Sequence, residues 1–373
     1  MVEEVERYTF TVNGKTVTTT ENKSLLRFLR DDLHLLSVKD GCSQGACGTC
    51  TVVIDGVATR GCVMNTKRAN GKVIETVEGL SHEEQEAFVY AFGSVGAVQC
   101  GFCIPGMVMS GAALIRRNPN PSEDEVKEAI KNNICRCTGY KKIIEGILKA
   151  ARILRGEEQI DPELERGDNY GVGSKAFRVD VRPKVLGYGK YPDDVTDVEY
   201  PDMAYGSCVR SRYPRARVLK IDVSEAEALP GVIGVLKAED VPVNKVGHIQ
   251  QDWDVFIAEG SITRDMGDAL CMVVAEDEKI LEAAKKLVKI EYEELPVVRD
   301  IYEARAEGAP LVHEEVKSNL CQSRHITRGN AKEALENSAF TVTKHFSTPF
   351  TEHAFLEPEC AVAFPYKDGV KIL

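Results

Sequence analysis

Three cysteines and three glycines fall within the eleven residues DGCSQGACGTC, positions 40–50. A fourth cysteine follows after eleven more residues, so the spacing is Cys42-x4-Cys47-x2-Cys50 and then Cys62. Two irons bridged by two sulfides need four thiolates, and one short loop can hold three of them. The spacing is typical of plant-type [2Fe–2S] sites. This first group of cysteines therefore predicts an iron–sulfur site.

Three glycines, Gly41, Gly45 and Gly48, lie beside or between these cysteines. We expect them to supply the positive φ angles and the close backbone approach that tight wrapping needs. The freed N–H groups can then point at sulfur. Zinc also accepts four thiolates, but its usual sites pair C-x2–4-C units. A redox-active C-x-x-C pair would leave the other two cysteines without a role. The loop therefore favours iron and sulfide over both alternatives.

A second group consists of Cys100 and Cys103 in QCGFC, and Cys135 and Cys137 in CRC. Helical residues lie between the two pairs, so we expect both pairs at helix ends, where positive N-termini stabilise an anionic group. Zinc stays open here, because this spacing is not diagnostic by itself. The position directly behind an iron–sulfur loop favours a second redox centre.

The other four of the twelve cysteines are scattered singly, and we expect them to be small buried hydrophobic side chains: Cys208, Cys271, Cys321 and Cys360. The first residues, MVEEVERYTF, are acidic and lack the basic and apolar regions of a secretory signal. A cytoplasmic location is therefore expected, where structural disulfides are disfavoured. The net charge of −11 argues against a nucleic-acid partner. No apolar run is long enough for a membrane span.

The elements that must position the first loop form a small α+β domain, residues 1–78. Alternating segments turn at Asn13-Gly14 and at Asp55-Gly56, which predicts two hairpins. Between them, leucines at helical spacing predict a helix over residues 24–33, with Ser24 as its N-cap.

The second group lies in a predicted bundle of about four helices, residues 79–156. Ser81 with Glu84, and Ser122 with Glu125, form capping boxes that mark two helix starts. Another helix is expected just after Cys103, ending at the prolines of NPNP. The segment YKKIIEGILKAARILRG predicts the last helix.

Beyond the bundle, residues 157–182 are polar and without clear period, so we interpret them as a linker. Residues 183–305 contain strand–turn–strand and strand–helix–strand patterns and predict a mixed α/β domain. Residues 306–373 resemble the beginning of another domain, which stops in mid-strand at DGVKIL.

The segments GCSQGACGTCTVVIDG, QCGFCIPGMVMS and NNICRCTGYKKI occur in this order. They resemble the iron–sulfur portion of the xanthine dehydrogenase/aldehyde oxidoreductase family of molybdenum hydroxylases. Downstream, MAYGSCVRSRYPRARVLKIDV resembles the family's α/β hammerhead domain. NLCQSRHITRGNAKEAL and TPFTEHAFLEPECAVAF resemble the start of its molybdenum-binding domain.

The resemblance implies a multidomain α+β fold: a β-grasp ferredoxin-like [2Fe–2S] domain, a four-helix [2Fe–2S] domain, a hammerhead domain and the incomplete start of a molybdopterin-binding domain. It implies that Gln99 and Cys137 contact the pterin. Glu352, His353 and Glu357 have no recognised ligand spacing, which favours a structural role. The resemblance makes all eight clustered cysteines the ligands of two [2Fe–2S] clusters: Cys42, Cys47, Cys50, Cys62, Cys100, Cys103, Cys135 and Cys137.

The sequence departs from the family in two respects. No flavin-binding (FAD) segment separates the bundle from the hammerhead, so electrons are expected to leave for a separate flavin subunit or another external acceptor. The catalytic glutamate and the glycine-rich segments that hold molybdenum in the family are not matched, so no residue is assigned as a catalytic base. The chain is expected to be a fragment or one part of a split enzyme, with a missing downstream portion as its partner.

In the complete enzyme, the resemblance implies molybdopterin, a homo-oligomer and hydroxylation of a carbon next to nitrogen or oxygen. The small-molecule substrate would be a purine, another N-heterocycle or an aldehyde. The alternative is a stand-alone two-cluster electron-transfer protein without substrate chemistry.

Overall fold

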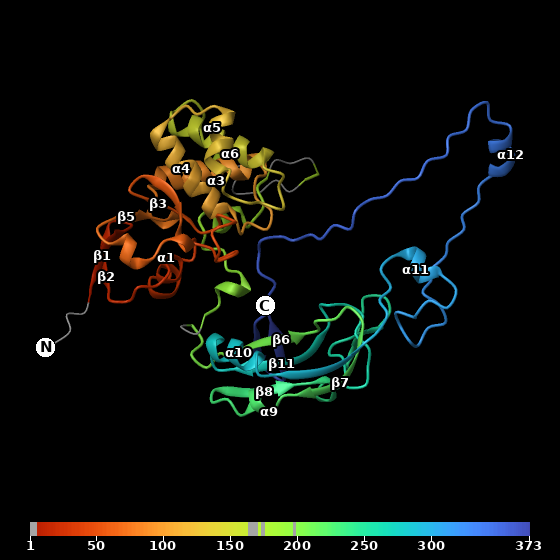
Figure 1. The fold of residues 1–373 in the computed structure, drawn as a ribbon. Coiled ribbons are helices and arrows are strands. Elements are labelled where there is room, and N and C mark those ends of the chain that lie inside the picture. The colour runs from red at the N-terminus through yellow and green to blue at the C-terminus, as the bar shows by residue number, and fades with distance from the viewer. Residues whose placement is uncertain (1–5, 163–170, 173–175, 197–198) are drawn as a thin grey trace. The chain divides into compact units, whose positions relative to one another are not determined.

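The computed structural model describes residues 6–162, 171–172, 176–196 and 199–373. The chain forms two compact units, one of residues 1–195 with 348–373 and the other of residues 196–347 (Figure 1). In the described part of the chain, no helix is long and apolar enough to cross a membrane. Residues 163–170 and 173–175 of the predicted linker lie outside the described residues.

A five-stranded mixed sheet supports the first cysteine loop. Its strand order is β2-β1-β5-β3-β4, in which β1 and β5 run parallel and the other neighbours antiparallel. Both predicted hairpins are confirmed, because Asn13-Gly14 and Asp55-Gly56 turn with positive φ angles between paired strands. The strands are β1 (Tyr8–Val12), β2 (Lys15–Thr19), β3 (Thr51–Ile54), β4 (Val57–Arg60) and β5 (Val73–Glu75).

The predicted helix over residues 24–33 is present but changes its hydrogen bonding partway. It begins as α1 (Leu25–Arg27) and continues as a π-helix, η1 (Phe28–Asp32). Ser24 occupies the N-cap position, but its side chain makes no capping hydrogen bond. Short helical turns complete this part: η2 (Gly61–Val63), α2 (Thr66–Ala69) and η3 (Val77–Gly79).

Four helices pack side by side in the second part of this unit, as predicted (Figure 1). They are α3 (His82–Val95), α4 (Ile104–Arg117), α5 (Glu123–Ile130) and α6 (Lys141–Leu154). Both predicted capping boxes are formed, at Ser81 with Glu84 and at Ser122 with Glu125. Phe88, Phe92 and Met107 are fully buried in the shared core. This core fixes the helix ends that carry the second cysteine group.

Residues 176–195, which we call the strap, pack against the bundle and the first domain. The strap contains α8 (Val181–Val185) and η4 (Pro192–Asp194). Phe177, Val181 and Val185 are buried in the helical core. The hammerhead boundary predicted at residue 183 stays a prediction, but residues 183–195 belong to the first compact unit.

The second unit contains the predicted α/β elements. Its sheets pair β6 with β11 and β11 with β8, β7 with β12, and β9 with β10. Leu270 and Val273 on β11 are fully buried in its core. The elements are β6 (Tyr205–Arg210), β7 (Ala216–Asp222), α9 (Ser224–Glu227), β8 (Val232–Leu236), η5 (Ala238–Asp240), β9 (Lys245–Val246), β10 (Trp253–Asp254), β11 (Ala269–Ala275), α10 (Glu278–Lys285) and β12 (Lys289–Glu294).

The remaining residues form few elements. After α11 (Ile301–Arg305), an extended exposed segment carries α12 (Ala331–Glu336) (Figure 1). The predicted strand in DGVKIL is β14 (Gly369–Ile372), which pairs antiparallel with β13 (Ala363–Tyr366).

Candidate metal centres

The first cysteine loop wraps as its glycines predict, with one correction. Gly45 and Gly48 have φ angles of +75° and +72°. Gly41 does not have a positive φ, so this part of the prediction is wrong. Its role is close approach, because a Cβ at Gly41 would lie 3.2 Å from the Cys47 sulfur and 3.0 Å from Thr49 Oγ1. All three glycines therefore allow close approach, and two of them, Gly45 and Gly48, also supply left-handed turns.

The first group consists of three thiols of this loop and Cys62 of η2. Cys42 lies next to Cys47 and Cys50 lies next to Cys62, and Cys47 also acts on Cys50, so the four thiols are neighbours. The backbone N–H groups of Gln44 and Cys47 donate to Cys42 Sγ over 3.4 Å and 3.5 Å. Burial opposes ionisation of Cys42, but backbone N–H donors, first that of Cys47, lower its pKa to about 7. Burial raises the pKa of the Cys50 thiol to about 12.

The cysteines of the second group lie in the segments that precede α4 and α6. Cys103 is the N-cap residue of α4, and the CRC segment lies just before α6. Cys100 and Cys137 have their sulfur atoms 3.6 Å apart, and Cys103 interacts with Cys135. A hydrogen bond from Cys103, opposed by burial, lowers the pKa of Cys135 to about 5. The predicted placement at a helix end is confirmed for Cys103; Cys135 and Cys137 lie in the connection between α5 and α6, before the N-cap residue Tyr140.

Pairs of thiols fit a [2Fe–2S] cluster, in which two irons share four protein ligands. A single zinc ion needs its four ligands around one point. Among the described residues, no three or more His, Cys, Asp or Glu side chains gather so that they could hold one metal ion. The eight thiols form two groups of four, the number that each of two dinuclear clusters would need.

A direct backbone contact joins the two sites. Ile134 N–H donates to the carbonyl oxygen of Cys47 over 2.7 Å, and Ile134 is bonded to Cys135. Buried Asn133 supports the contact, because its Nδ2 donates to Gly48 O over 2.9 Å. One hydrogen bond and a few covalent bonds therefore connect a thiol of the first site with a thiol of the second.

Sequence reasoning missed two polar residues next to the cysteines. Asn133 bridges the sites, and the hydroxyl of Tyr140 accepts a hydrogen bond from Cys135 N–H over 3.0 Å. Tyr140 adopts a φ of +68°, which is rare for a residue with a side chain. Both residues belong to the quoted motif NNICRCTGYKKI, so polar residues flanking the CRC cysteines were the available signal.

The two residues predicted to contact a pterin lie near the second site. Gln99 is exposed, and its carbonyl oxygen accepts hydrogen bonds from Lys184 and Arg178 over 3.0 Å and 3.2 Å. Cys137 is partly buried and adjoins Cys100. The exposed amide of Gln99 is free to reach a group outside this domain. The pterin contacts themselves stay predictions.

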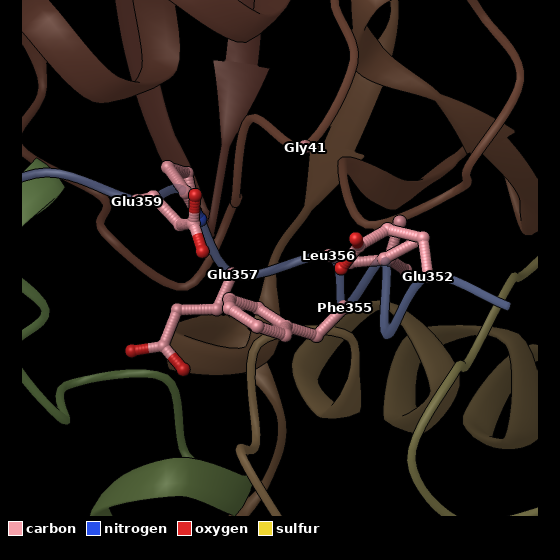
Figure 2. Close-up of a pocket in the computed structure, with 8 residues that line it drawn as sticks. Gly41, Glu352, Phe355, Leu356, Glu357 and Glu359 are labelled. Carbon is pink, nitrogen blue, oxygen red and sulfur yellow. The ribbon is translucent and has the colours of Figure 1, made fainter. Parts of the chain in front are cut away.

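The segment with Glu352, His353 and Glu357 borders a cleft of about 420 Å³ that also includes Gly41 (Figure 2). Arg136 holds this segment, donating to the carbonyl oxygens of Glu352 and His353 over 2.8 Å each. Figure 2 shows the carboxylates of Glu352, Glu357 and Glu359 pointing in different directions. These carboxylates do not form a shared metal site, and the prediction of a structural role remains.

The prediction for the scattered cysteines is partly wrong. Cys271 is fully buried, and Cys208 is partly buried, as a small hydrophobic residue can be. Cys321 and Cys360 are exposed. Both lie in the last part of the chain, in which most described residues are exposed.

Comparison with known families defines the class of protein. Residues 10–76 match the 2Fe-2S iron-sulfur cluster binding domain, and residues 76–148 match the [2Fe-2S] binding domain. Residues 187–296 match the aldehyde oxidase and xanthine dehydrogenase a/b hammerhead domain, and residues 312–373 match the molybdopterin cofactor-binding domain. The predicted four-part composition and the two [2Fe–2S] domains are confirmed. The exact boundaries and the β-grasp label stay predictions.

Individual relatives agree with this class. Aldehyde oxidoreductase of Megalodesulfovibrio gigas is 33% identical over 91% of this chain, which spans 39% of that relative. The nicotinate dehydrogenase small FeS subunit of Eubacterium barkeri is 43% identical over 35% of this chain and 86% of its own length. A solved aldehyde oxidoreductase from Desulfovibrio gigas, 30% identical, superimposes with a TM-score of 0.72 over 83% of this chain and 36% of its own.

The chain therefore belongs to the xanthine dehydrogenase/aldehyde oxidoreductase family of molybdenum hydroxylases. It contains the iron–sulfur region and the start of the molybdenum-binding domain.

Proposed function

We propose that this chain is the iron–sulfur electron-transfer portion of a molybdenum hydroxylase, with its eight clustered cysteines as cluster ligands. The observation that carries the proposal is the pairing of thiols at both sites, together with the Cys47–Ile134 hydrogen bond between them. When bound, each cluster takes up and releases one electron. The protein holds the sites close together and connects them through its backbone.

In this proposal, Cys42 and Cys47 would hold one iron of the first cluster, and Cys50 and Cys62 would hold the other. Cys100 with Cys137, and Cys103 with Cys135, divide the second cluster in the same way. Each assignment follows the thiol pairs, because two ligands of one iron must lie next to each other. The backbone N–H groups of Gln44 and Cys47, which donate to Cys42 Sγ, stabilise the thiolate form of Cys42.

We place the second site on the molybdopterin side and the first site on the acceptor side. Gln99 and Cys137 are the proposed pterin contacts, and both belong to the second site. Ser43, Gln44 and Ala46 of the first loop are exposed, which gives an external electron acceptor access to that site. The acceptor is a separate flavin subunit or another redox protein.

The complete enzyme hydroxylates a small molecule. The relative that matches 91% of this chain is named an aldehyde oxidoreductase, and a shorter relative is named a nicotinate dehydrogenase subunit. These names support aldehydes and N-heterocycles, and xanthine dehydrogenase relatives support purines. An activity assay of the complete enzyme therefore offers one substrate from each class. The stand-alone electron carrier is less well supported, because the hammerhead and molybdopterin-binding matches extend far beyond the clusters.

Single cysteine substitutions test the assignment of the ligands. Cys47→Ser should remove only the first cluster, and Cys103→Ser only the second, because each ligand set is complete within its own site. Electron paramagnetic resonance (EPR) of the reduced protein separates the two signals. Cys321→Ser is the matched control, since this exposed cysteine lies outside both sites. Two unchanged signals in Cys47→Ser and Cys103→Ser would refute the ligand assignment.

A further inference from the structure

The strap covers the loop that carries the first two thiols of the second site. Gly101 leaves room for it, with a φ of +89°. A Cβ at Gly101 would lie 2.5 Å from Lys184 Cδ and 2.8 Å from the Tyr191 hydroxyl. The rings of Tyr191 and Phe102 pack edge to face with centroids 5.3 Å apart, and both residues are buried. Strap side chains therefore take the place of water over this loop.

Tyr191 makes a directed contact with a proposed ligand residue. Its hydroxyl donates to the carbonyl oxygen of Cys100 over 2.7 Å. The backbone of Tyr191 is fixed in turn, since its N–H donates to Asp194 Oδ2 over 3.2 Å. Asp194 is fully buried and paired with two cations of the first domain, Lys39 at 2.5 Å and Arg30 at 3.0 Å. Tyr191 is thus held in place by the first domain while it contacts the second site.

Positive charge from the strap gathers at the preceding residue. Lys184 and Arg178 both donate to the carbonyl oxygen of Gln99. Asp180 accepts from the same two side chains, over 2.8 Å from Lys184 and 2.9 Å from Arg178. Lys184 and Arg178 thus place two cations at the Gln99 carbonyl, while the carboxylates of Asp180 and Glu357 lie on the same side of the second site. Among the described residues, Lys184, Arg178 and Asp180 form no hydrogen bond with the first cysteine loop.

We infer that two side chains of the strap, Tyr191 and Lys184, raise the reduction potential of the second site selectively, with Tyr191 as a positioning residue that acts through the Cys100 backbone. The inference rests on the proposed function, because it requires a cluster at that site. Reduction adds negative charge, which the Tyr191 O–H dipole and the Lys184 ammonium group stabilise. Exclusion of water strengthens both interactions, because the local dielectric constant falls; the solvation that burial removes is lost equally in a variant that keeps the strap in place.

The test is an EPR-monitored redox titration of the whole chain. Tyr191→Phe keeps the ring and removes only the hydroxyl, so the potential of the second cluster should fall. A change of up to about tenfold in the reduction equilibrium, about 59 mV for one electron, is expected. The first cluster is the internal reference and should not move. Tyr188→Phe is the matched control, because Tyr188 lies on the same strap with its side chain exposed.

A second variant keeps the test decisive if Tyr191→Phe fails to assemble its second cluster. Lys184→Met removes a cation of the strap that contacts the same loop and should also lower the second potential alone. Unchanged second potentials, or equal shifts of both clusters, would overturn the inference and leave the strap with a purely structural role. The proposed function fails separately, if the unsubstituted chain itself lacks a second [2Fe–2S] signal.

Discussion

Asn133→Ala tests the junction between the two iron–sulfur domains. Asn133 is 3% exposed, and its side chain makes three hydrogen bonds. Its Nδ2 donates to Gly48 O over 2.9 Å and to Thr51 Oγ1 over 3.1 Å, and its Oδ1 accepts from Ser110 Oγ over 2.8 Å. The alanine variant loses all three bonds and leaves the Ser110 hydroxyl buried without this acceptor. The junction should therefore become markedly less stable.

The size of the effect follows from these contacts. Each hydrogen bond contributes about 0.5–1.5 kcal/mol, so the loss is about 3 kcal/mol in the free energy of unfolding. For a unit of this size, 1 kcal/mol shifts the melting temperature by about 2–4 °C, which gives a decrease of about 6–12 °C.

Anaerobic thermal unfolding, followed by circular dichroism, measures this decrease. Asn132→Ala is the matched control, because the neighbouring Asn132 is exposed and should change the melting temperature little. If the melting temperature falls no further in Asn133→Ala than in Asn132→Ala, the reasoning about the junction is refuted.

Three other predictions concern single residues. Gly48→Ala should destabilise the chain by about 1–2 kcal/mol because of its φ of +72°, and by about 1–3 kcal/mol more because the new Cβ overlaps backbone atoms. Gly71 has a φ of +77° in open space, so Gly71→Ala should show only the first cost. Equal free energies of unfolding for the two variants would contradict this. Arg182 lowers the pKa of Glu86 below 4.5, so their ion pair stabilises the fold above pH 4.5 and this stabilisation is lost as the pH falls through the lowered pKa. Glu86→Gln should therefore flatten this part of the plot of melting temperature against pH, and an unchanged plot would count against the prediction. Exposed Cys321 should react with a maleimide in the native protein, and protection until unfolding would show that it is covered.

Elements with a local physical cause could be predicted from the sequence. Asn13-Gly14 and Asp55-Gly56 turn with positive φ angles, and Ser81 caps its own helix, so each of these signals lies within a few residues. The cysteine groups were also readable, because their spacing along the chain reflects the geometry of the cluster.

Features that depend on distant partners could not be predicted. Asp194 is buried because Arg30 and Lys39 face it, and neither residue is near it in the sequence. The apolar residues of the strap do not follow a helix or strand periodicity, so the sequence showed no sign that the strap packs on the helical core. Gly41 was expected to have a positive φ, but crowding by Thr49 and not a left-handed turn explains the glycine there.

The most direct test of the account is the metal content of the anaerobically purified chain, together with EPR after reduction by dithionite. Two [2Fe–2S] clusters predict about four irons and four acid-labile sulfides per chain, with two separate paramagnetic signals. Stoichiometric zinc without iron, or iron sufficient for a single cluster with a single signal, would contradict the assignment of the eight cysteines to two dinuclear sites.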